Sequence, residues 1–135
     1  MIEETVPFDD SEWVVLEAKD LGKKLKANTE YAEEKSTEGR FVAVRYKVTN
    51  KGAKEAHVLD APKLTDGKGR AYGAIDLEAF YVPEKGKTLG LEVLAPGEAK
   101  EAWTVFESPP DAKELKLEIH GLGLFGQKKL VDVGL

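Results

Sequence analysis

Two histidines and a few serines are the side chains of this sequence that could take part in nucleophilic or acid–base chemistry. The serines stand in turn or cap contexts, and the chain lacks the Gly-x-Ser-x-Gly motif that exposes a nucleophilic serine. His57 and His120 are separated by much of the chain, so a zinc site would need carboxylates to complete it. The sequence therefore predicts no catalytic residue. Were the protein a hydrolase, we expect His57 or His120 to act as general base beside a divalent metal ion.

Carboxylates gather in stretches that we expect to be loops. Asp9, Asp10 and Glu12 stand close together near the N-terminus, and Asp66 lies in a glycine-rich turn. Calcium takes six to eight oxygen ligands on flexible backbone, so these four residues are candidate Ca²⁺ ligands, although their spacing is not that of an EF-hand. The alternative is that each group is a solvated charged surface. We expect no other cofactor, because the sequence has no glycine-rich phosphate loop.

A third set of candidates is aromatic. Tyr31, Tyr72, Phe80, Tyr81 and Phe125 fall in or beside stretches without regular alternation. Such rings could hold a glycan or a peptide through loops at one end of a β-sandwich. The alternative, which we favour, is that the rings fold back and close the open ends of the sandwich.

Composition excludes several classes of function. The chain has 135 residues, with 25 acidic and 20 basic side chains, a formal charge of −5 and a pI near 5.2. Lysines and arginines alternate with acids instead of forming a basic stripe, which disfavours nucleic acid as a partner. The absence of cysteine excludes thiol catalysis, disulfides and cysteine-ligated metal sites. No stretch is apolar for long enough to span a bilayer.

Period-two alternation predicts the elements that would position these residues. The best strand is Arg40–Asn50, which places apolar side chains on one face and has apolar residues on both faces in its first half. Lys113–Ile119 repeats the pattern, with its leucines and isoleucine pointing inward. The inward residues of these two strands are Val42, Val44, Tyr46, Val48, Leu115, Leu117 and Ile119. Further candidate strands are Trp13–Ala18, Ala56–Leu59, Leu89–Leu94, Ala102–Phe106 and Leu130–Val133.

Turn residues separate these strands. Asn50-Lys51-Gly52 can supply a positive φ, Asp66–Gly69 predicts a hairpin, and Pro96-Gly97 predicts a turn. Two stretches lack the rhythm: residues 20–38 read as a polar excursion with one short strand at most, and in residues 73–88 Asp76 could cap a helical turn. We therefore expect an all-β fold, an immunoglobulin-like antiparallel β-sandwich of about seven to nine strands.

The chain reads as a single β-sandwich domain over residues 1–135. We expect residues 1–10 to be an N-terminal arm, residues 11–120 the core, and residues 121–135 a C-terminal extension that adds an edge strand. The acidic N-terminus does not resemble a signal peptide. Either the protein is cytoplasmic, or a leader has been removed from this chain.

Three blocks of sequence, in this order, resemble the telokin-like, immunoglobulin-related family of bacterial extracytoplasmic domains of unknown function. They are residues 39–52, residues 64–72, and Leu94–Glu98 followed by Val105–Pro109 and Leu115–Ile119. The resemblance implies a secreted or lipid-anchored protein whose leader was removed, and it supplies no catalytic residue. We expect a binding or accessory module for an unknown protein, peptide or glycan. The alternatives are a Ca²⁺- or Mg²⁺-dependent hydrolase, such as a phosphodiesterase or nuclease, and a structural unit of a larger envelope protein.

Overall fold

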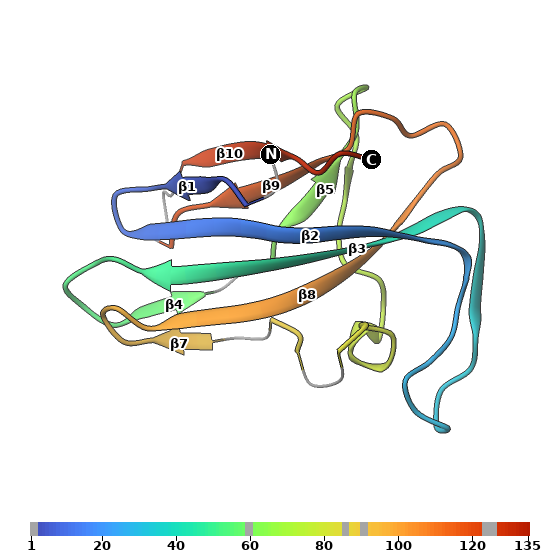
Figure 1. Ribbon diagram of the computed structural model, residues 1–135, viewed down its shortest axis with the longest axis horizontal. Coiled ribbons are helices and arrows are strands. Elements are labelled where there is room, and N and C mark those ends of the chain that lie inside the picture. Colours follow the sequence, from blue (N-terminus) through green and yellow to red (C-terminus); the bar gives the residue numbers. More distant parts are fainter. Residues whose placement is uncertain (1–2, 59–60, 85–86, 90–91, 123–126) are drawn as a thin grey trace.

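Strands dominate the computed structural model, which describes residues 3–58, 61–84, 87–89, 92–122 and 127–135 (Figure 1). The strands are β1 (Thr5–Pro7), β2 (Ser11–Leu25), β3 (Lys35–Asn50), β4 (Ala56–Val58), β5 (Lys63–Thr65), β6 (Ala71–Tyr72), β7 (Glu92–Leu94), β8 (Ala99–Ser108), β9 (Lys116–His120) and β10 (Lys128–Asp132). One 3₁₀ turn, η1 (Glu78–Phe80), lies between β6 and β7. Among the described residues no helix is long and apolar enough to cross a membrane.

Two four-stranded antiparallel sheets form the layers of the fold. One has the order β1-β2-β3-β8 and the other the order β10-β9-β5-β6, while β4 and β7 pair separately. These ten described strands confirm the all-β antiparallel sandwich and slightly exceed the expected number, since β1 lies in the segment expected to be an arm. The C-terminal segment forms β10, at the edge of the second sheet.

The core lies between the two sheets and is built by the predicted alternation. The seven inward residues of Arg40–Asn50 and Lys113–Ile119 are all buried, as expected. The second of these strands begins at Lys116, three residues later than predicted. Trp13 and Val15 of β2, Leu64 of β5 and Phe106 of β8 pack into the same cluster. Burial of this apolar surface is the main stabilising contribution to the fold.

The expectation of a polar excursion over residues 20–38 is wrong. β2 continues to Leu25 and β3 begins at Lys35, with these two residues paired, so the two strands extend beyond the sandwich as a hairpin (Figure 1). We call residues 20–38 the distal hairpin. Many of its side chains are solvent-exposed, and its polar composition hides the period-two pattern on which the prediction relied.

A second apolar cluster lies beneath the distal hairpin, on the face of β3 that points away from the main core. It joins Phe41 and Ala43 of β3 to Leu25, Tyr81 and Trp103, together with Val82 and Val105. This cluster explains why the first half of the predicted strand is apolar on both faces. It also fixes the distal hairpin and residues 78–82 against the first sheet.

Two details of the turns differ from expectation. Gly52 does not have a positive φ, because the Asn50 carboxamide holds this turn instead: its Nδ2 donates to the carbonyls of Lys54 and Leu94, both at 2.9 Å, and its Oδ1 accepts from Gly52 N at 2.9 Å. The expected helical turn exists as η1, but its N-cap is Leu77, at φ 56°, without a side-chain cap from Asp76. The predicted Asp66–Gly69 hairpin is confirmed by the pairing of β5 with β6.

The outer edge of β8 is covered by groups from residues 73–84 and from Lys87 rather than by a full strand. Ile75 N donates to the carbonyl of Val105 at 2.9 Å, and Trp103 N donates to the carbonyl of Lys87 at 2.6 Å. Between them, Val105 N donates to a Glu78 carboxylate oxygen at 3.2 Å. Three separate groups thus satisfy the backbone of an edge that would otherwise be open.

Candidate functional site

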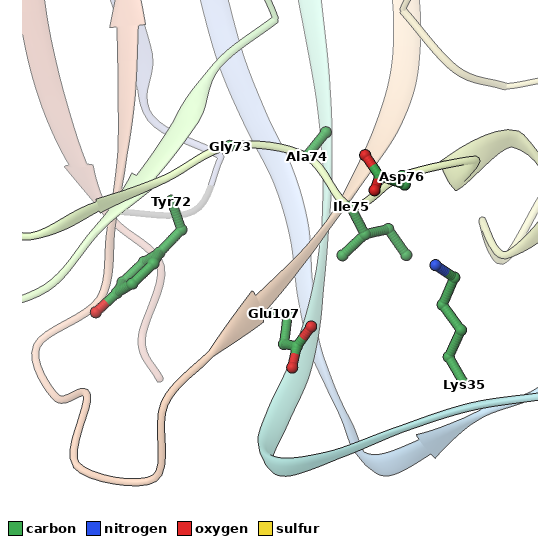
Figure 2. A pocket seen from close by; sticks show the side chains of 7 residues that line it. All are labelled: Lys35, Tyr72, Gly73, Ala74, Ile75, Asp76 and Glu107. Atoms are coloured by element: carbon green, nitrogen blue, oxygen red, sulfur yellow. The ribbon is translucent and has the colours of Figure 1, made fainter.

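A surface hollow of about 350 Å³ lies where β3 begins and β8 ends, under the segment that leaves β6 (Figure 2). It is lined by seven residues: Lys35, Tyr72, Gly73, Ala74, Ile75, Asp76 and Glu107. Residues 72–76 pass from the second sheet to the edge of the first, because Tyr72 pairs with Leu64 and Ala74 pairs with Phe106. The hollow therefore lies at the junction of the two layers.

Charged groups surround the hollow without neutralising one another. The Lys35 ammonium lies 5.2 Å from the centre of the Tyr81 ring, a cation–π contact. Asp76 and Glu107 are exposed, and neither side chain makes a hydrogen bond or ion pair with any residue that the structure describes. Figure 2 shows Glu107 projecting from β8 and Lys35 from the other side, with Ile75 between them. These groups suit the binding of a polar ligand; none of them is a histidine or a hydroxyl nucleophile activated by a base.

A second hollow, of about 430 Å³, adjoins the first. It is lined by residues 37–39 and 107–110, so the two share Glu107. The close approach of β3 and β8 here depends on Gly39, since a Cβ on that residue would lie 1.8 Å from the carbonyl oxygen of Ser108. A glycine is needed where two backbones come this close.

The four candidate aromatic residues that the structure describes do not share one site. Tyr72 is half-buried and lines the first hollow. Tyr81 is only 6% exposed and packs in the second cluster, with its hydroxyl donating to the carbonyl of Glu33, as the alternative of ring closure expects. Tyr31 is 87% exposed and Phe80 38% exposed, and neither lines the described hollows. Phe125 lies outside the described residues.

Asp66 is the centre of a hydrogen-bonded turn. Its side chain is 0% exposed and accepts from the Tyr72 hydroxyl and Arg70 Nε, both at 2.6 Å, and from the backbone N of Lys68 and Arg70, both at 3.0 Å. Arg70 and Lys68 also reach Asp111, at 3.1 and 3.0 Å. Burial alone would raise the pKa of Asp66, but these hydrogen bonds outweigh it and hold the pKa at about 2. Asp66 therefore fixes the β5–β6 hairpin, and its oxygens are already in use.

The remaining candidate metal ligands are dispersed. Asp10 Oδ1 accepts from Ser11 Oγ at 3.1 Å and from Leu122 N at 3.2 Å, which brings it near the end of β9. Glu12 lies 3.8 Å from the Lys51 ammonium. Within the described ranges, no three His, Asp or Glu side chains form a group that could hold a metal ion.

The two histidines are also apart from each other in the fold. His57 is exposed on β4, opposite Val93, whereas His120 ends β9 in the second sheet and pairs with Lys128. Asp9 is exposed, next to Asp10. In the part of the chain that the structure describes, neither histidine thus has a set of carboxylates like that of a metal-dependent hydrolase.

The sequence of this chain matches the model of the family described as "Domain of unknown function (DUF4352)" over residues 1–130. The chain belongs to this family. No curated protein sequence matches it. This membership agrees with the sequence resemblance in one respect, that the family has no known function. It therefore assigns no activity to this DUF4352 domain.

Solved structures resemble the DUF4352 domain in fold. The yjhA protein of Bacillus subtilis has a TM-score of 0.74 and 14% identity, with 97% of each chain covered. An uncharacterized β-sandwich protein of Clostridium difficile has a TM-score of 0.55 and 12% identity, with 98% of this chain and 91% of that chain covered. A B. subtilis protein described as a "putative lipoprotein (ycdA)" has a TM-score of 0.66 and 15% identity. The match covers 98% of this chain and 39% of that chain. At these identities the likeness supports the shared β-sandwich fold alone.

Sequence reasoning missed the charged groups that line the first hollow. Lys35 and Glu107 come from distant parts of the chain and line the same hollow, because β3 and β8 are neighbours in the first sheet. Asp76 was expected to cap a helical turn, yet its side chain lines the hollow. No local pattern marks these residues, since exposed charges are common along the whole chain.

Proposed function

We propose that this DUF4352 domain is an extracytoplasmic binding or accessory module, which recognises its ligand at the first hollow and performs no chemistry of its own. The observation that carries the proposal is the set of charged groups around the hollow: Asp76 and Glu107 are exposed, and both lack a partner among the residues that the structure describes. The two-layer antiparallel architecture also supports the immunoglobulin relation that the sequence resemblance implies.

Two observations support an extracytoplasmic location. The sequence resembles a family whose members are mostly secreted or lipid-anchored. A B. subtilis protein of similar fold is described as a putative lipoprotein. The genomic sequence upstream of Ile2 tests this part: a leader with a lipobox cysteine supports it, and an open reading frame that begins at Met1 contradicts it.

Binding at the hollow is tested by ¹H–¹⁵N NMR. Peptidoglycan fragments, soluble glycans and short peptides are titrated separately into the labelled domain. We expect one class to shift the amide signals of residues 73–76 and Glu107, and the double variant Lys35→Ala/Glu107→Ala to lose that response. Glu55→Gln, in the exposed loop after β3, is the control and should bind normally.

Assays for hydrolysis complete the test. Phosphodiester, ester and glycoside substrates are incubated with the protein in Ca²⁺ or Mg²⁺, with and without a chelator. We expect no turnover. Chelator-sensitive hydrolysis that is lost in His57→Ala or His120→Ala would overturn the proposal in favour of a hydrolase.

A further inference from the structure

We propose that the ligand of the first hollow is an extended peptide, which pairs as an added strand with the backbone at Ala74 and places a lysine or arginine side chain near Asp76 and Glu107. This inference rests on the proposed function and names the ligand class. Peptides bind many β-sandwich edges through main-chain hydrogen bonds, with side-chain pockets supplying the specificity.

The backbone of residues 73–76 has one free edge. Ala74 forms an antiparallel bridge with Phe106, and Ile75 N donates to the carbonyl of Val105 at 2.9 Å. Neighbouring residues of an extended chain direct their backbone groups to opposite sides, so the N–H and carbonyl of Ala74 face away from β8. Ala74 makes no backbone hydrogen bond elsewhere in the described part of the chain. One N–H group and one carbonyl are thus available to a guest strand, before the chain turns at Asp76.

Space for such a strand exists beside this edge. Gly73 and Ala74 are exposed and line the hollow of about 350 Å³, so no large side chain of theirs blocks the approach of another backbone. An extended chain advances about 3.3 Å per residue, so a segment of about three residues spans the edge. The free edge is short, which limits the guest to a short segment.

Charge selects the side chain of the guest. The hollow holds the carboxylates of Asp76 and Glu107 against one ammonium, Lys35, which already contacts the Tyr81 ring. The remaining excess of negative charge favours a cationic group. Ile75 lies between these charges and can pack against the aliphatic stem of a lysine or arginine while the head group stays in water (Figure 2).

A glycan fits the hollow less well. Carbohydrate rings stack on exposed aromatic faces, and Tyr72 is the one aromatic residue of this lining. Its hydroxyl is bound to Asp66 and the residue is half-buried. The exposed rings of Tyr31 and Phe80 do not belong to the lining. We therefore make glycan binding an outcome of the test.

The probes are the capped peptides Ac-Val-Lys-Val-Lys-Val-NH₂ and Ac-Val-Glu-Val-Glu-Val-NH₂, titrated into the ¹⁵N-labelled domain. Two modified versions of the lysine peptide serve as controls. One is N-methylated at the valines and the other at the lysines, so each can no longer donate hydrogen bonds from one of its two backbone edges. We expect the lysine peptide to bind more tightly than the glutamate peptide. The amide proton of Ala74 should exchange more slowly in the complex, and at least one N-methylated version of the peptide should lose binding.

Asp76→Asn and Glu107→Gln should each weaken binding of the lysine peptide about twofold to fivefold, as expected for exposed ion pairs. Glu55→Gln is the matched control and should bind the peptide normally. Equal binding of both peptides, or binding that both N-methylated versions retain, overturns the peptide inference. If a glycan shifts the amide signals of the hollow residues and the peptides do not, the peptide inference is overturned but the proposed function is left intact. If no probe shifts these signals, the proposed function fails as well.

Discussion

Substitution of Gly39 by alanine tests the contact between β3 and β8 most directly. The new Cβ would lie 1.8 Å from the carbonyl oxygen of Ser108 and 3.0 Å from the carbonyl carbon of Pro109, where ordinary contacts begin at 3.4 Å. Both opposing groups are backbone, so the strands themselves must separate. Overpacking of a rigid region costs about 1–3 kcal/mol, and the weakened pairing of Arg40 with Ser108 adds about 1 kcal/mol.

We therefore expect Gly39→Ala to lower the free energy of unfolding by about 3 kcal/mol and Tm by roughly 10 °C. Urea unfolding followed by tryptophan fluorescence measures the change, provided that the m value stays constant. Gly73→Ala is the matched control, because nothing lies within 4 Å of its Cβ and its φ is not positive. That variant should be unchanged or more stable by about 0.4–1 kcal/mol. A Gly39→Ala protein within about 0.5 kcal/mol of the wild type would refute the reasoning.

Three further predictions concern polar groups. The hydroxyls of Tyr46 and Thr104 are 2.8 Å apart and buried, so Tyr46→Phe leaves that of Thr104 without its partner. This should lower the free energy of unfolding in urea by about 1–3 kcal/mol, and the double variant Tyr46→Phe/Thr104→Val should recover most of the loss. The folded pKa of Asp66, about 2, is below its ordinary value of 3.8, so its contribution to stability is complete above pH 3.8 and is lost as the pH falls towards 2. Asp66→Asn should remove this dependence. Burial raises the pKa of Glu78 above its ordinary value of 4.5, so stability falls as the pH rises through this range; Glu78→Gln, which keeps an acceptor for Val105 N, should stabilise the protein at pH 7 but not at pH 4.

Each of these has an outcome that contradicts it. A double variant at Tyr46 and Thr104 no better than Tyr46→Phe would mean that the hydroxyl pair is not an isolated unit. An unchanged acid limb of the stability curve in Asp66→Asn would show that other carboxylates control it. Equal effects of Glu78→Gln at both pH values would show that its charge does not matter.

The main layers of the fold could be predicted because one face of each strand packs in the core. In the second half of β3 and in β9 the buried residues alternate with polar ones, and this alternation specifies both the strand and its inward face. The distal hairpin could not be predicted in this way, since its strands are stabilised by pairing and by a small second cluster. Strand pairing leaves no periodic signal in polar side chains.

The turn after β3 and the first hollow escaped prediction for a different reason. The Asn50 carboxamide bonds to the carbonyl of Leu94, and Lys35 of β3 lines the same hollow as Glu107 of β8. Both arrangements join residues that are remote in sequence, so they exist only once the strand register is known. The acidic candidates show the reverse: Asp66 stands out in the sequence, yet the structure uses it to bind Arg70 and Tyr72.

The covering of β8 affects how copies of this protein behave when crowded together. A long bare strand invites the same strand of a neighbour and leads to fibres. Here the Ile75 amide, the Glu78 carboxylate and the Lys87 carbonyl occupy that border. What stays available on this side is the brief stretch at Ala74, too small to template stacking of whole sheets. The border of β8 is therefore protected against pairing with a neighbouring molecule, although a short peptide can still bind there.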